Sequence, residues 1–286
     1  MIAFVGAGPG AADLITVRGQ MFLKEADVVI YAGSLVNPDL LAVCRKDCEI
    51  YNSAYMTLEE VLHVMEEAEE KGKKTVRLHT GDPSLYGAIK EQIDLLKSKG
   101  ISYEICPGVS SFCGAAAALE AEYTLPGISQ SVVITRMAGR TPVPVKESIQ
   151  SWAAHRATMV IFLSTGMLKE LEQALTEGGY PEDTPAAIVY KATWEDEKVC
   201  RCKVCELSRT AQEEQITKTA LIVVGDILAG GYERSELYNP AFTTEYRQAH
   251  VPYEEQKKLQ ADSRKNKEQQ IQDIQGIGKK EAGADE

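Results

Sequence analysis

Residues 75–87 read Thr-Val-Arg-Leu-His-Thr-Gly-Asp-Pro-Ser-Leu-Tyr-Gly. The first part, Thr75–Leu78, has the pattern of a buried strand. A Gly-Asp-Pro turn begins at Gly81, after two more residues. Such a turn lies at the carboxyl end of its strand, the edge where α/β sheets hold small ligands. Asp82 offers a hydrogen-bond acceptor there, Pro83 stiffens the bend, and the glycines leave room for a ligand against the backbone. The stretch therefore predicts an α/β sheet with a ligand site at this edge.

Two further loops have the same position behind a strand. The loop Gly6–Gly10, Gly-Ala-Gly-Pro-Gly, follows the apolar run Ile2–Val5, and the loop Pro107–Ser111, Pro-Gly-Val-Ser-Ser, follows Ile101–Cys106. Because the carboxyl ends of parallel strands share one edge of a sheet, we expect the three loops to form one site.

Strand and helix patterns alternate along the first half, which predicts crossover connections and a mostly parallel sheet. The expected strands are Ile2–Val5, Val28–Tyr31, Thr75–His79 and Tyr103–Cys106, and the expected helices are Leu14–Glu25, Leu58–Lys71, Ala88–Lys99 and Ser111–Glu120. A Pro-Gly break within Tyr123–Ile128 predicts a domain boundary.

The second half predicts a mixed sheet, since the alternating stretch Trp194–Cys205 is typical of a hairpin. The other expected elements are strands at Ser131–Thr135, Thr158–Leu163, Ala186–Tyr190 and Ala220–Val224, and helices at Val145–Ala154, Met167–Gly178 and Ser208–Gln215. We therefore expect two α/β domains, residues 1–125 and 126–247, with a ligand cleft between them. Residues 248–286 are polar and predict a solvated helix with a frayed end.

Composition limits the class of protein. The chain has 286 residues, 44% of them hydrophobic, which suffices for a full core. Its formal charge of −11 argues against a nucleic-acid binder, whose binding face would be basic. No cationic leader or membrane-length apolar run is seen, so we expect a soluble, cytoplasmic protein. Seven cysteines, an odd number, suggest reduced thiols.

The glycine-rich loop Gly6–Gly10 also invites a dinucleotide-binding interpretation. That site needs an acidic residue at the tip of the second strand, where this chain has Ala32–Ser34. Asp27 precedes the strand, at its other end. Pro9 lacks the N–H that a phosphate cradle would use. A purely structural turn remains the alternative to a ligand-facing loop.

No metal site is predicted. Cys200, Cys202 and Cys205 lie close together, but no fourth ligand completes a zinc set. His79 ends the strand before the Gly-Asp-Pro turn, and we expect a hydrogen-bonded structural histidine there.

Four motifs in order resemble the tetrapyrrole (precorrin) methylases, which use S-adenosylmethionine to methylate carbons of the corrin precursor. The motifs are Val5–Gly10, Ala26–Tyr31, Thr80–Pro83 and Pro107–Ser111. The resemblance covers residues 1 to about 247 and implies a donor held in the interdomain cleft, largely by backbone. A homodimer is also implied.

Carried over residue by residue, the resemblance implies two sets of ligand contacts. The donor contacts are Thr80, Gly81, Asp82, Leu85, Ser110, Ser111, Phe112, Leu163, Ala192, Thr219 and Ala220. The substrate contacts are Gly8, Pro9, Gly10 and Tyr31, with Arg136 and Arg140 as partners for the carboxylates of the tetrapyrrole and Arg18 and Lys146 as further candidates. No catalytic base is assigned, because Tyr31 and Asp82 form no relay with a histidine.

Within the family, Tyr31–Val36 (Tyr-Ala-Gly-Ser-Leu-Val) and Thr135–Pro144 are similar to enzymes that methylate precorrin-4 at C11. The cobalt-containing substrate is favoured over the cobalt-free one. Uroporphyrinogen methylases have Asp where this chain has Ala32. The alternatives on the same fold are another precorrin position, diphthine synthesis and ribosomal RNA ribose methylation. A dinucleotide-dependent oxidoreductase and a non-catalytic tetrapyrrole carrier are the alternatives from other classes.

Overall fold

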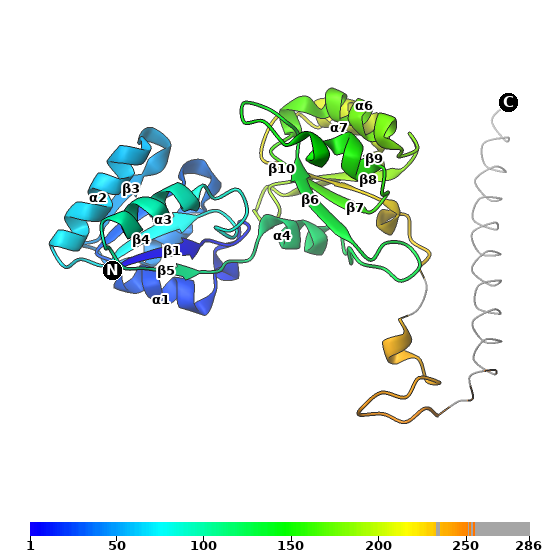
Figure 1. The fold of residues 1–286 in the computed structure, drawn as a ribbon, viewed down its shortest axis with the longest axis horizontal. Coiled ribbons are helices and arrows are strands. Elements are labelled where there is room, and N and C mark those ends of the chain that lie inside the picture. Colours follow the sequence, from blue (N-terminus) through cyan, green and yellow to red (C-terminus); the bar gives the residue numbers. More distant parts are fainter. Residues whose placement is uncertain (233–234, 251, 253, 255–286) are drawn as a thin grey trace. The chain divides into compact units, whose positions relative to one another are not determined.

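A computed structural model describes residues 1–232, 235–250, 252 and 254. Met1–Gly231 form one compact unit with two five-stranded sheets, and the described residues from Tyr232 on belong to a second unit (Figure 1). In the second unit a short 3-10 turn spans Glu236–Tyr238, and the Arg247 guanidinium donates to the carbonyls of Leu237 and Asn239. The predicted polar tail lies almost entirely outside the described residues.

The first sheet is parallel throughout and has the order β3-β2-β4-β1-β5. Its strands are β1 (Ile2–Gly6), β2 (Val28–Tyr31), β3 (Glu49–Asn52), β4 (Thr75–His79) and β5 (Tyr103–Cys106). The predicted bounds of β2, β4 and β5 are confirmed. The strand β3 was not predicted, because its sequence Glu-Ile-Tyr-Asn is short and half exposed and carries no buried-strand pattern.

Alternating residues of this sheet pack against helices on its two faces. On one face, Val5, Val29 and Leu78 pack with Leu23 of α1 (Val17–Glu25). On the other, Phe4 and Ile30 pack with α2 (Leu58–Glu70) and α3 (Ile89–Ser98). A capping box fixes the start of α2, where Thr57 and Glu60 each bond the other's backbone N–H.

The second sheet is mixed and has the order β6-β7-β10-β8-β9, with only β6 and β7 parallel. Its strands are β6 (Val132–Arg136), β7 (Thr158–Phe162), β8 (Pro185–Tyr190), β9 (Lys198–Lys203) and β10 (Ala220–Val224). The predicted hairpin within Trp194–Cys205 is wrong in detail. That stretch holds one strand, β9, whose hairpin partner is β8.

Helices α5 (Ile149–Ala153), α6 (Leu168–Gly178) and α7 (Leu207–Glu213) cover one face of the second sheet. The other face packs against α4 (Ser111–Ala118), which follows β5 of the first sheet. A β-turn at Leu125–Ile128 comes after α4; the Ile128 N–H donates to the Leu125 carbonyl over 3.1 Å, and Gly127 has a φ of 76°. The Pro-Gly break, at which we predicted a domain boundary, therefore forms a turn between α4 and the second sheet.

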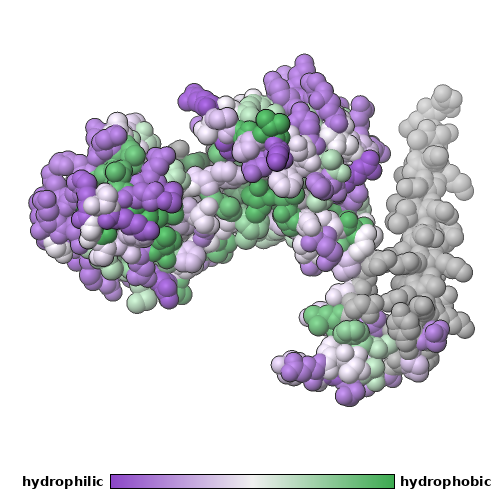
Figure 2. Space-filling view, viewed as in Figure 1, coloured by the Kyte–Doolittle hydropathy of each residue, from purple (hydrophilic) through white to green (hydrophobic). Residues whose placement is uncertain are grey.

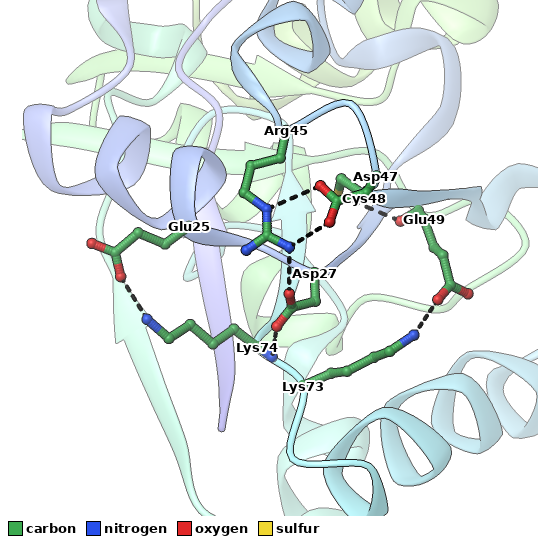
Figure 3. A network of polar contacts seen from close by, with 8 residues as sticks. All are labelled: Glu25, Asp27, Arg45, Asp47, Cys48, Glu49, Lys73 and Lys74. Atoms are coloured by element: carbon green, nitrogen blue, oxygen red, sulfur yellow. Dashed lines mark hydrogen bonds and ion pairs between the residues drawn. The ribbon is translucent and has the colours of Figure 1, made fainter.

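The amino ends of β2, β3 and β4 are joined by charged side chains (Figure 3). Asp27 accepts from the Lys74 backbone N–H at 2.8 Å and pairs with Arg45 at 2.9 Å. Arg45 also pairs with Asp47, and Lys74 with Glu25. Asp27 therefore lies at the edge opposite the three loops, which confirms that it is out of place for a ribose ligand.

Hydrophilic residues cover much of the visible face of the described chain (Figure 2). Among the residues that the structure describes, no helix is both long enough and apolar enough to span a membrane.

Candidate functional site

The three loops predicted to form one site do meet at the carboxyl edge of the first sheet. Gly8 and Gly81 form an antiparallel bridge, in which each N–H donates to the other's carbonyl over 3.2 and 2.8 Å. The Ala7 N–H donates to the His79 carbonyl at 2.7 Å. The loops after β1 and β4 are therefore held together by backbone hydrogen bonds.

The loop after β5 lies against both of the others through glycine backbone. A Cβ on Gly108 would stand 2.2 Å from the Gly81 oxygen, and a Cβ on Gly6 would stand 2.5 Å from the Gly108 Cα. No side chain fits at these two positions without moving backbone. Gly81 itself has a φ of 63°, in the left-handed region.

Asp82 ties the same loops together with its carboxylate. Its Oδ2 accepts from the Gly108 N–H at 2.8 Å, and its Oδ1 accepts from the N–H of Ser84 at 2.8 Å and from the Ser84 hydroxyl. Burial acts to raise the pKa of Asp82, but the hydrogen bonds from Ser84 and Gly108 outweigh it and hold the pKa below its usual value. The carboxylate is thus an ionised tie between turns, placed at the edge of the site.

A cavity of about 570 Å³, a size typical of small-molecule sites, opens at these loops. One wall comes from the first sheet, with Pro9, Ala32, Thr80–Asp82 and Ser110 among its residues. The other comes from the carboxyl ends of β7 and β8 and the start of β10.

Ten of the eleven residues predicted to contact a methyl donor line this cavity: Thr80, Gly81, Asp82, Leu85, Ser110, Ser111, Leu163, Ala192, Thr219 and Ala220. Phe112 does not line it; it belongs to α4 and packs against the core between this helix and the second sheet. Of the predicted substrate contacts, Pro9 lines the cavity, and Gly8 and Gly10 flank it. Tyr31, Arg136 and Arg140 are not among its lining residues.

The second wall is built from strained backbone. Leu163, Lys191 and Thr219 line the cavity with φ values of 52°, 46° and 58°, although none is glycine. Tyr86 on the first wall has a φ of 57°. Each such residue costs about 1–3 kcal/mol, and such costs concentrate at functional sites. Leu163 is also 65% exposed, which leaves an apolar side chain uncovered in the cavity wall.

Arg136 and Arg140 differ in their surroundings. The Arg136 guanidinium donates to the carbonyls of Met137, Thr141 and Pro142 at 3.0–3.1 Å and so holds its own loop. Arg140 is exposed. Arg18 lies 4.0 Å from Glu104, and Lys146 is exposed. The sequence did not distinguish a loop-holding arginine from an available one.

Two polar groups at the end of β4 lack partners among the described residues. His79 Nε2 and Thr80 Oγ1 are buried without a hydrogen bond. The expectation of a hydrogen-bonded His79 is wrong, since the ring instead stacks on Phe4. Burial, and then the Arg77 charge, lower the pKa of His79 to about 3, so the ring is neutral near pH 7.

Several lining residues were not predicted as site residues. Tyr86 and Phe162 face each other with ring centroids 5.4 Å apart, one from each wall. Lys191 pairs with Asp196 and lies 5.4 Å from the ring centre of Trp194. Tyr86 follows the Gly-Asp-Pro turn in the sequence, but no sequence feature predicts its contact with Phe162.

Within the described residues no group of histidine, cysteine and acidic side chains could hold a metal ion. Cys200 and Cys202 are partly buried on β9, next to the core of the second sheet.

Comparison with known proteins gives a consistent result. Residues 1–208 match the model of the tetrapyrrole (corrin/porphyrin) methylases. A Methanocaldococcus jannaschii protein named cobalt-precorrin-4 C(11)-methyltransferase is 53% identical over 88% of this chain and 98% of its own. A Mycobacterium tuberculosis (strain H37Rv) protein named precorrin-4 C(11)-methyltransferase is 43% identical over 86% of this chain and 99% of its own. A solved cobalt precorrin-4 methyltransferase has a TM-score of 0.78 and 47% identity, covering 79% of this chain and 95% of the other.

Proposed function

Because this chain belongs to the tetrapyrrole (corrin/porphyrin) methylases, we propose that it methylates C11 of a precorrin-4 to give a precorrin-5, in cobalamin biosynthesis. S-adenosylmethionine is the proposed methyl donor and S-adenosylhomocysteine the product. One observation carries the proposal. The loops that carry the family motifs meet backbone to backbone and form one wall of a cavity of ligand size.

The donor is proposed to bind the ten predicted residues that line the cavity. Thr80 offers a buried hydroxyl that lacks a partner among the described residues, and Leu163 offers an uncovered apolar surface. A sulfonium nucleoside with an amino-acid tail presents both polar and apolar groups, so the lining fits it. Phe112 does not line the cavity and is proposed to act only through the core against which it packs.

The donor supplies an activated methyl group on a positively charged sulfur. The part of the chain's own residues is to align the donor with the ring carbon and to exclude water. The displacement breaks the sulfur–methyl bond, forms the carbon–methyl bond and moves the positive charge from sulfur to the conjugated ring, which then loses a proton. Asp82 is bound by three donors of its own turns and is not free to take a proton. We therefore assign positioning to the backbone and name no residue as the base for the proton that the ring loses.

The tetrapyrrole is proposed to lie along the glycine-rich loop, near Gly8, Pro9, Gly10 and Tyr31. Arg140 is the more available of the two predicted carboxylate partners, because it is exposed and Arg136 already holds carbonyls of its loop. The cobalt-containing substrate remains our preference, in line with the relative that has the higher identity. A homodimer and a cytoplasmic location stay predictions, testable by analytical ultracentrifugation and cell fractionation.

The test is a binding measurement followed by a product analysis. Calorimetry should show binding of S-adenosylhomocysteine and none of NAD(P)H; the reverse would contradict the proposal. With methyl-labelled donor, mass spectrometry should place one new methyl at C11 of precorrin-4 or its cobalt form. Binding without methyl incorporation would indicate a carrier, and a methyl elsewhere would indicate another precorrin enzyme.

A matched pair of variants tests the location of the donor. Gly81→Val puts a branched side chain at a φ of 63° and about 3.4 Å from the Ser111 nitrogen, so binding should be lost. Gly166→Ala has no atom within 4 Å of the new Cβ and should bind like the wild type. Equal binding by both variants would refute the assigned pocket.

A further inference from the structure

Arg77 is a buried cation without a carboxylate. It lies on β4 and is 7% exposed, yet no ion pair of the described residues includes it. Its Nη1 donates to the Ile30 carbonyl at 3.1 Å and its Nε to Gln92 Oε1 at 3.4 Å. A guanidinium has five N–H donors, so three are not used by these bonds. Burying a charge in this state is costly unless something else pairs with it.

His79 also has a polar atom that lacks a partner among the described residues, and it lies on the same strand as Arg77. It follows Arg77 by two residues on one strand, so both side chains point to the same face of the sheet. Both line the cavity, and His79 Nε2 is buried with no partner among the described residues. A neutral imidazole with Nε2 protonated donates one hydrogen bond.

The charge of the cavity points to an anion. Its lining carries three cationic residues, Arg77, Lys191 and Lys218, and one carboxylate, Asp82. Lys191 is paired with Asp196, and Asp82 is bonded within its loops. Lys218 is exposed, so Arg77 is the buried cation left for a ligand, in a chain whose formal charge is −11.

We propose that Arg77 and His79 form a carboxylate-binding subsite at the β4 end of the cavity, with Arg77 as the charge partner and His79 as a neutral donor. The ligand chemistry is a carboxylate, from the amino-acid end of the methyl donor or from an acid side chain of the tetrapyrrole. This inference rests on the proposed function. Burial lowers the pKa of Arg77 to about 10, so the guanidinium is still charged near pH 7.

The first arm measures the donor. Calorimetry compares S-adenosylhomocysteine with its analogue that lacks the carboxylate, on the full chain and on Arg77→Met. If the donor carboxylate occupies the subsite, Arg77→Met weakens S-adenosylhomocysteine at least about 30-fold, as expected when a buried charge pair loses a partner, and leaves the analogue unchanged. His79→Phe keeps the ring on Phe4 and should weaken it about tenfold.

The second arm measures the tetrapyrrole. If its carboxylate occupies the subsite, donor affinity is unchanged, while KM for precorrin-4 rises by about 30-fold at unaltered kcat. Arg77→Lys keeps the charge and should restore part of the loss in either arm, and it serves if Arg77→Met does not fold. Arg45→Met is the matched control, because that arginine is paired with Asp27 and Asp47 at the other edge of the sheet.

The outcomes separate the two ideas. If Arg77→Met and His79→Phe fold and neither changes donor affinity nor KM, the subsite is refuted while the proposed function stands. If the wild-type chain binds no S-adenosylhomocysteine, the proposed function itself fails, and the subsite with it.

Discussion

Gly108→Ala tests how closely the three loops must approach. The new Cβ would stand 2.2 Å from the Gly81 oxygen and 2.7 Å from the Gly6 Cα. Both are backbone atoms, so the clash is not relieved by a side-chain rotation, and the loops must part by about 1 Å. Overpacking of this kind costs about 2–3 kcal/mol of unfolding free energy.

The parting of the loops should also break the hydrogen bond from the Gly108 N–H to Asp82, which is 2.8 Å long. Urea unfolding gives the stability, and calorimetry with S-adenosylhomocysteine gives the affinity; we expect both to fall. Gly166→Ala serves as the control, since it adds the same atom where nothing lies within 4 Å. If Gly108→Ala matches this control in both measurements, the argument for a backbone-built site is wrong.

Three further predictions concern side chains around the first sheet. The pKa of His79 is lowered from 6.5 to about 3 in the folded protein, so the unfolded chain binds more protons as the pH falls below 6.5. The folded protein therefore loses stability over this range. Between pH 7 and pH 5, urea unfolding should show that the wild type loses about 2 kcal/mol more of its unfolding free energy than His79→Phe does. Asp82 has a lowered pKa, so Asp82→Ala should be less stable than the wild type at pH 7, and the gap should close as the wild type protonates below pH 3.8; a constant gap in acid unfolding would contradict this. Asp27→Ala should lower the thermal midpoint but leave donor affinity unchanged, because Asp27 lies at the opposite edge; weaker binding in calorimetry would argue for a ligand role.

Turn residues made much of the first half predictable. Gly-Asp-Pro and Pro-Gly favour turns because of the backbone dihedral preferences of glycine and proline, so they end the strands that precede them. The sequence alone therefore places the loops at one edge of the sheet. The strand β3 was missed because it is held by pairing with β2, and its half-exposed Glu49–Asn52 shows no hydrophobic period. The hairpin was misplaced because the alternation over Trp194–Cys205 continues through a turn.

The polar roles were less predictable than the loops. Arg77 lies in a strand whose pattern indicates burial, and a buried arginine is expected to have a protein partner. Only the structure shows that its bonds go to the Ile30 carbonyl and Gln92 and that it lines the cavity. Arg136 is the reverse case: its position in a family motif suggested a ligand contact, and the structure shows it bonded to three carbonyls of its own loop.

The two walls of the cavity differ mainly in how they bring backbone to a ligand, although Tyr86 on the first wall also has a left-handed φ of 57°. The first wall removes side chains, so that Gly6, Gly81 and Gly108 touch directly, and this leaves a mark in the sequence. The second wall keeps its side chains and bends the chain into the left-handed region at Leu163 and Thr219, which no residue type announces. Such strain persists only where the surrounding structure enforces it. Leu163 directly follows β7 and Thr219 directly precedes β10, and both strands are fully buried. These strands supply the rigidity, so the core of the second sheet fixes the shape of the wall.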